Sequence, residues 1–147
     1  MSPEAELFTP PSQDATPRVY LSPRRVAFGG GAADRVGPLA RAYAPTAFFV
    51  TYPPGRTTAA GGPARVAASL AAAGLTVVRA EIGADPDPDA VDAAVAACRA
   101  AGAGVVVGVG GGGPMDAAKA VAMLARNPGP AVERALRPQR LADYVGQ

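Results

Sequence analysis

The chain has 147 residues, enough for one domain with a single hydrophobic core. Its 14 basic and 12 acidic residues leave a formal charge of +2, and because the arginines are scattered we expect no nucleic-acid partner. Zero histidines and one cysteine exclude a typical zinc site and a Ser-His-Asp or Cys-His nucleophile within this chain, and no apolar run is long enough to span a membrane.

The N-terminal region does not resemble a secretory signal, because residues 1–16 combine acids and prolines without a basic or an apolar segment. We expect residues 1–17 to form a disordered tail. The single cysteine, Cys98, permits no intrachain disulfide, which fits a reducing compartment and predicts a cytoplasmic protein. Cys98 shares a predicted helix face with Val91 and Val95, so we interpret it as a small core residue.

A second glycine-rich stretch, Gly29–Gly31, lies near the start of the ordered part. Short strands are predicted before it, over residues 18–21 and 25–28. A helix is predicted after it, over residues 32–42, with Val36, Leu39 and Tyr43 on one side. The three glycines could hold a phosphate, but we interpret them as a plain turn. Pro38 should kink or break the helix that follows, because an interior proline costs about 3 kcal/mol.

Strands and helices then alternate along the chain. The predicted strands cover residues 47–51, 76–82 and 105–109, and the predicted helices cover residues 63–73, 88–101, 114–126 and, more briefly, 130–136. This alternation predicts an α/β fold with a parallel sheet, flanking helices and right-handed crossovers. Ligands bind beyond the carboxyl ends of the strands in such sheets. Thr51–Pro53, Asp85–Asp89 and Gly110–Gly113 should therefore converge on one crevice.

The glycine loop at residues 110–113 organises this prediction. Val105–Val109 is a short β-branched run that reads as a buried strand, which we place at the centre of the sheet. Pro114 suits the first position of a helix, with Gly113 as its cap. The N–H groups and the dipole of such a helix start attract phosphate. We therefore predict a pyrophosphate site, the alternative being a merely flexible connection.

The run from Gly110 to Ala120 resembles the cofactor loop of the iron-containing (group III) alcohol dehydrogenases, which typically reads GGGS-x-x-D-x-A-K. The resemblance extends from about Pro23 to Gly146. It implies a Rossmann-like parallel sheet with flanking helices and a small N-terminal β-hairpin, and it makes residues 18–147 a dinucleotide-binding domain. The cofactor it implies is NAD or NADP, held by Gly110, Gly111, Gly112 and Gly113.

Three positions depart from the family pattern. Tyr52 stands where an acid commonly holds the adenosine ribose, and it could stack on adenine, leave room for a 2′-phosphate near Arg56, or be an ordinary surface tyrosine. Asp87 stands where an asparagine is usual, and we interpret it mainly as the cap of the following helix. Gly113 replaces the serine of the loop, which removes one hydroxyl donor.

The remaining candidate cofactor residues are Thr51, Asp116 and Lys119. Thr51 ends the first parallel strand at the predicted crevice. Asp116 is predicted in the first helical turn, where it either stabilises the helix end or faces the nicotinamide ribose or substrate. For Lys119 we favour pairing with Asp116, three residues earlier, over a place beside the cofactor.

The resemblance implies hydride transfer between an alcohol or polyol and NAD(P). Family members are roughly twice as long or more, and a helical second domain supplies an aspartate and histidines that hold the metal. We expect that domain to be absent here, so the chain has no catalytic or metal residues of its own. Iron or zinc would enter only with a complementary helical domain from another chain. The exposed crevice side could also drive homo-oligomer formation. The alternative is a stand-alone, non-catalytic domain that binds a nucleotide or a protein partner.

Overall fold

Three parallel strands form the sheet in this computed structural model, which describes residues 25–55, 61–127 and 129. They are β1 (Thr46–Thr51), β2 (Thr76–Glu81) and β3 (Val105–Val109), in the order β2-β1-β3. The predicted parallel sheet is confirmed, and each strand agrees with its predicted range to within one residue. The expectations for residues 1–17, 18–21 and 130–136 lie outside the described residues.

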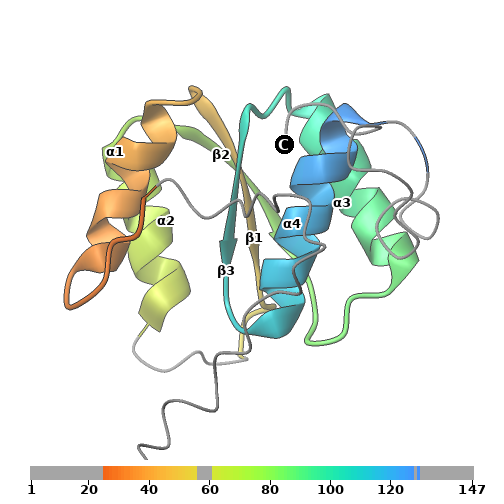
Figure 1. The fold of residues 1–147 in the computed structure, drawn as a ribbon, viewed down its shortest axis with the longest axis horizontal. Coiled ribbons are helices and arrows are strands. Elements are labelled where there is room, and N and C mark those ends of the chain that lie inside the picture. Colours follow the sequence, from red (N-terminus) through yellow and green to blue (C-terminus); the bar gives the residue numbers. More distant parts are fainter. Residues whose placement is uncertain (1–24, 56–60, 128, 130–147) are drawn as a thin grey trace, which may run out of the picture.

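Helices cover both faces of this sheet (Figure 1). A 3₁₀-helix, η2 (Ala32–Arg35), leads into α1 (Val36–Arg41), which packs with α2 (Gly62–Ala72) on one face. The other face carries α3 (Pro88–Ala100) and α4 (Gly112–Arg126). The α/β architecture follows from this alternation, because α2 and α3 each connect two parallel strands, α1 precedes the first strand and α4 follows the last. No helix in the described part of the chain is long and apolar enough to cross a membrane.

The core divides into two clusters, one on each side of β1. Phe48 and Val50 point toward α3 and α4, whereas Ala47 and Phe49 point toward α2, as the period of two in a strand requires. Cys98 is 1% exposed and belongs to the cluster with α4, which confirms its interpretation as a core residue. Burial raises the pKa of its thiol, and the charge of the neighbouring Arg99 opposes that rise.

The centre of the sheet is β1 rather than Val105–Val109. All but the first residue of β1 are buried, whereas every residue of β3 is half-buried. The valine-rich run was predicted to be central, but strand order depends on where the crossovers carry the chain. The connection through α2 carries the chain to one side of β1, and the connection through α3 returns it to the other side.

This topology creates a switch point between β1 and β3. The helices that follow these strands, α2 after β1 and α4 after β3, lie on opposite faces of the sheet. The connections leaving the two strands therefore diverge at their carboxyl ends. Thr51 and Val109 are register partners at this edge. The segments that follow them, starting at Tyr52 and Gly110, therefore leave the sheet side by side.

Pro38 shapes the first helical segment as predicted. The segment breaks into η2 and α1, with Pro38 as the third residue of α1. Proline has no N–H to offer the carbonyl of Asp34, four residues earlier. The hydroxyl of Ser69 in α2 donates to that carbonyl instead, at 2.7 Å. The Ser69 Oγ also accepts a hydrogen bond from the Gly37 N–H, at 2.9 Å. One side chain thus compensates for the break and ties α1 to α2.

Two expectations near the start of the described chain are wrong. Residues 25–28 form no strand, and Val26 and Phe28 are 80% and 102% exposed. No strand among the described residues lies beside this segment to bond with its backbone. Tyr43 was placed on the apolar side of the first helix with Val36 and Leu39, yet it is 67% exposed, because α1 ends at Arg41 before that face is continued.

Candidate functional site

The glycine loop follows β3 directly and opens α4 at the switch point. The helix begins two residues earlier than predicted, at Gly112, with Gly111 as its N-cap and Pro114 as its third residue. The missing N–H of Pro114 costs nothing there, since the N–H groups of the first turn have no partner within the helix. No side chain in the described part of the chain caps this end. Its N–H groups and positive dipole end suit an anion.

The four glycines of this loop have different surroundings. Gly110 has a φ of +154° and faces Pro114 and Tyr52. A β-carbon added at Gly111 would lie 2.9 Å from the Tyr52 hydroxyl. A β-carbon at Gly113 would collide with the carbonyl oxygens of the loop between β2 and α3, whereas one at Gly112 would meet nothing within 4 Å. Gly112 is therefore the position where another molecule can approach the main chain.

The predicted convergence at this loop is confirmed for the segments at Tyr52 and Gly110–Gly113, whereas the contact after β2 comes from Gly83 and Ala84 rather than from Asp85–Asp89. Tyr52, which follows β1, lies over Gly110 and Gly111. The backbone of Gly83 and Ala84, which follows β2, closes on Gly113. The contact falls just before the predicted turn, because residues 85–87 lead away into the cap of α3. The missing serine hydroxyl at position 113 also has a structural reason, since the β2–α3 loop leaves a side chain no room there.

Tyr52 is half-buried against the loop rather than extended into solvent. Its Cε2 atom lies 3.1 Å from the place that a β-carbon would take at Gly110. Gly110 and Gly111 thus make room for the tyrosine ring. Arg56, which the sequence placed near a 2′-phosphate, lies outside the described residues.

Thr51 is fully buried, and no described residue forms a hydrogen bond with its Oγ1. A buried hydroxyl without a partner costs roughly 1–3 kcal/mol. By the alternation along β1 its side chain faces the layer of α2, on the opposite side from α4. Thr51 therefore lies at the switch point without pointing at the start of α4.

The side chain of Asp87 caps α3, as predicted. Its Oδ1 accepts from the N–H of Ala90 at 2.8 Å, and Pro88 follows as the first helical residue. This use of the carboxylate is local, and it explains why an acid is stable at that position.

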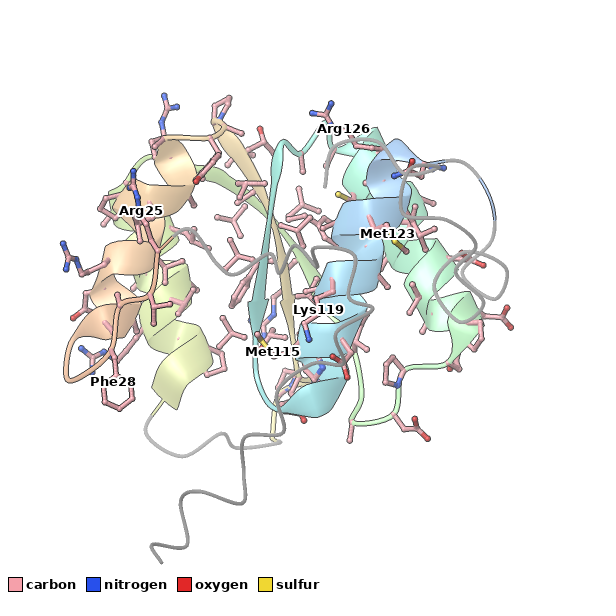
Figure 2. All side chains as sticks on the ribbon, viewed as in Figure 1. Arg25, Phe28, Met115, Lys119, Met123 and Arg126 are labelled. Atoms are coloured by element: carbon pink, nitrogen blue, oxygen red, sulfur yellow. The ribbon has the colours of Figure 1, made fainter. Side chains whose placement is uncertain are left out.

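Asp116 and Lys119 pair with each other at 2.9 Å, which confirms the favoured interpretation of Lys119. Both side chains are largely exposed. Asp116 does not lie in the first turn, because α4 begins at Gly112 and its first turn has no acid. Figure 2 shows Lys119 on α4, one turn beyond Met115. The helix start thus keeps its positive end without a carboxylate in its first turn.

Arg99 is a structural residue that the sequence did not reveal. From α3 it donates to the carbonyls of Leu124, Ala125 and Asn127 at 2.6, 3.1 and 3.1 Å, which satisfies the last turn of α4. Asn127 adds a bond from its amide to the Met123 carbonyl at 2.7 Å. No local pattern signals this contact, because it joins residues more than 20 positions apart.

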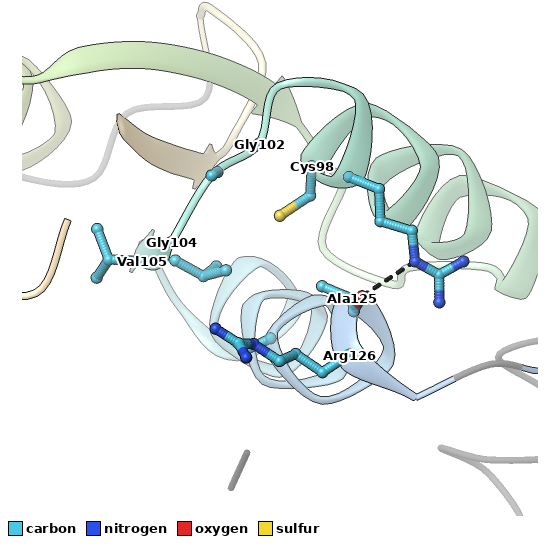
Figure 3. Close-up of a pocket in the computed structure, with 10 residues that line it drawn as sticks. Cys98, Gly102, Gly104, Val105, Ala125 and Arg126 are labelled. Carbon is cyan, nitrogen blue, oxygen red and sulfur yellow. Dashed lines mark hydrogen bonds between the residues drawn. The ribbon is translucent and has the colours of Figure 1, made fainter. Parts of the chain in front are cut away.

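A cavity of about 550 Å³ lies at the opposite edge of the sheet (Figure 3). It is bordered by the start of β3 and the ends of α3 and α4, with the Cys98 side chain directed toward it and Arg126 at its rim. This cavity is remote from the glycine loop. Within the described ranges no group of three or more His, Cys, Asp or Glu residues is placed to hold a metal.

A parallel sheet with helices on both faces and a glycine loop at its switch point defines the Rossmann-like class of α/β domains. The sequence matches the family described as iron-containing alcohol dehydrogenase over residues 23–144, and the chain belongs to that family.

Solved structures support the same assignment. The chain is 27% identical to the NADH-dependent butanol dehydrogenase A of Thermotoga maritima, with a TM-score of 0.73 over 85% of this chain and 32% of that protein. It is 30% identical to an alcohol dehydrogenase from an archaeal halo-thermophile of a Red Sea brine pool, with a TM-score of 0.69 over 78% of this chain and 28% of that one.

A 1,3-propanediol oxidoreductase is similar at 27% identity and a TM-score of 0.67, over 76% of this chain and 29% of its own. The chain thus spans about a third or less of each solved relative it matches. Comparison with curated protein sequences gives no match.

Proposed function

We propose that this chain binds NAD or NADP and serves as the cofactor domain of an alcohol dehydrogenase. The observation that carries the proposal is the open face of Gly112 at the uncapped start of α4, beside the switch point. The pyrophosphate fits there, because the first-turn N–H groups are directed toward it and no carboxylate occupies the first turn.

The roles of the chain's own residues follow from their positions. Main-chain N–H groups of Gly111, Gly112 and Gly113 bind the pyrophosphate, and the absent side chain at Gly112 lets it approach. Tyr52 borders the same surface. Asp116 and Lys119 lie one turn further along α4 and balance each other's charge, so they leave the field of the helix end unchanged. The bound dinucleotide supplies the hydride-accepting or hydride-donating group.

The proposed reaction is hydride transfer between an alcohol or polyol and the dinucleotide. A relative of this fold is described as an NADH-dependent butanol dehydrogenase, which supports both the cofactor and the substrate class. The chain has no histidine, so iron or zinc has to be held by groups from a complementary helical domain. By itself the chain binds cofactor without completing the reaction.

A second candidate is a stand-alone domain that binds a nucleotide or a protein partner without catalysis. The filled space beside Gly113 and the tyrosine over Gly110 and Gly111 favour it, because both reduce the surface that a family-typical loop would offer. Adding a His-rich helical domain of this family distinguishes the candidates. Activity with an alcohol and NAD(P) would support the first, and nucleotide binding without activity would support the second.

The test of binding is calorimetric titration with NAD and with NADP on the wild type and on Gly112→Ala. The alanine methyl has free space in the protein itself, so the fold should be unchanged, yet it occupies the place of the phosphate. We expect at least about a tenfold loss of affinity, which corresponds to 1.4 kcal/mol. Gly30→Ala is the matched control, since a β-carbon there also meets nothing within 4 Å.

The two variants should have the same thermal stability as the wild type, and Gly30→Ala should keep its affinity. Wild-type protein that binds neither dinucleotide would overturn the proposal. Equal binding by Gly112→Ala and the wild type would place the nucleotide elsewhere on the chain and overturn it as well.

A further inference from the structure

We propose that the Tyr52 hydroxyl donates a hydrogen bond to the pyrophosphate of the bound nucleotide. In this way Tyr52 supplies the donor that Gly113 has lost. The inference rests on the proposed function and names one more binding residue of the same site. It differs from a role in stacking on adenine, which would use the tyrosine ring rather than the hydroxyl.

The first support is the place of the hydroxyl. It lies 2.9 Å from the position of a β-carbon at Gly111, which is the N-cap of α4. The ring reaches this place by resting on Gly110, whose added β-carbon would lie 3.1 Å from Cε2. Because Gly110 and Gly111 have no side chains, the hydroxyl of Tyr52, which follows β1, lies beside the N-terminus of α4. Gly112, next in the chain, keeps the open face through which an anion approaches.

The second support is the crowding at Gly113. The carbonyl oxygens of Gly83 and Ala84 occupy the side on which a serine would carry its hydroxyl. A side-chain donor at this helix start cannot come from position 113 without moving that loop. The other flank of the glycine loop is the one that Tyr52 borders. Among the described residues in contact with the glycine loop, the side-chain hydroxyl is that of Tyr52.

A carboxylate near a pyrophosphate repels it, whereas an uncharged phenol O–H donates to it. A hydrogen bond to a charged group is stronger than a bond between neutral groups. Losing this bond should weaken binding measurably.

Tyr52→Phe tests the hydroxyl by itself. We expect it to weaken the binding of both inorganic pyrophosphate and ADP about tenfold in calorimetric titrations, because only the shared phosphate contact is lost. Tyr43→Phe is the matched control, since Tyr43 is exposed and precedes the start of β1, at the opposite edge of the sheet. It should bind both ligands as the wild type does.

Gly111→Ala provides a second variant that leaves the tyrosine in place. Its methyl would lie 2.9 Å from the hydroxyl and should displace it, with a similar loss of affinity for pyrophosphate. Combined with Tyr52→Phe it should add little, because both changes remove the same contact. Additive losses would contradict a shared contact and overturn the inference.

The outcomes separate the inference from the proposed function. If the wild type binds ADP and pyrophosphate and Tyr52→Phe binds them equally well, the hydroxyl has no such role, while the proposed function stands. If Tyr52→Phe is unchanged and Tyr52→Ala weakens ADP but spares pyrophosphate, the ring stacks on adenine and the inference is wrong. If the wild type binds neither ligand, the site and the inference fail together.

Discussion

Two glycine clusters precede helices in this chain, and only one of them forms a plausible anion site. Gly29–Gly31 forms a turn, with bonds from the Ala32 N–H to Gly29 and from the Asp34 N–H to Gly31 at 3.2 and 3.0 Å. It opens a 3₁₀-helix of four residues that carries Asp34 in its first turn. That carboxylate is paired with Arg65 at 2.7 Å.

Gly110–Gly113 differs in place and in what it starts. It follows an edge strand at the switch point and opens a helix of 15 residues with no acid in its first turn. A longer row of aligned peptides gives a stronger dipole, and no carboxylate neutralises it. Glycine content is similar in the two clusters, so the difference teaches that topology and local charge decide which loop can bind an anion.

The largest effect on stability is expected at Gly113, where carbonyl groups of the β2–α3 loop already occupy the space of a side chain. Gly113→Ser restores the residue typical of the family, but its β-carbon collides with the Gly83 and Ala84 carbonyls. Overpacking of this kind costs about 3 kcal/mol in free energy of unfolding, to be measured by chemical denaturation. Gly30→Ser in the first cluster should cost little, because its side chain enters open space.

Equal stability of Gly113→Ser and the wild type would mean that the β2–α3 loop yields easily. Gly113 and Gly30 would then tolerate a side chain equally well, and the difference in crowding between the two clusters would not affect stability.

A smaller loss of stability is expected from removing the Ser69 hydroxyl, which ties α2 to the helical segment after Gly29–Gly31. Ser69→Ala removes the bonds from the Gly37 N–H and to the Asp34 carbonyl, which Pro38 leaves without a helical partner. We expect a loss of about 1–2 kcal/mol in unfolding free energy. Nucleotide affinity should not change, since this contact lies on the other face of the sheet. A change in affinity would show that the two clusters are coupled.

The smallest effect is expected at Asp87, which caps α3 at the end of the loop that follows β2. Asp87→Ala should destabilise the protein by about 1 kcal/mol, and Asp87→Asn by only a few tenths, because asparagine also caps a helix. Thermal unfolding measures both. If the carboxylate serves only as a cap, Asp87→Asn leaves pyrophosphate affinity unchanged, whereas a clear gain would reveal repulsion of the ligand and sharpen the charge argument.

Much of the fold was predictable because its signals are local. The runs Thr46–Thr51 and Val105–Val109 are apolar and β-branched or aromatic, and Pro88 and Asp87 mark a helix start in their own sequence. The start of α4 was misplaced by two residues, since four successive glycines carry no side chain to mark a cap. The contacts of Arg99 and Ser69 had no local signal, because each joins two separate helices.

The sequence by itself determined the alternation of strands and helices, the core role of Cys98, the cap at Asp87 and the family of the chain. These depend on residues close together along the chain, where periodicity and backbone preference act. Tertiary structure alone decided that β1 is the central strand, that Tyr52 covers Gly110 and Gly111, and that Gly112 is open while Gly113 is not. Those outcomes depend on which distant segments share a volume, and close packing lets only one of them occupy it.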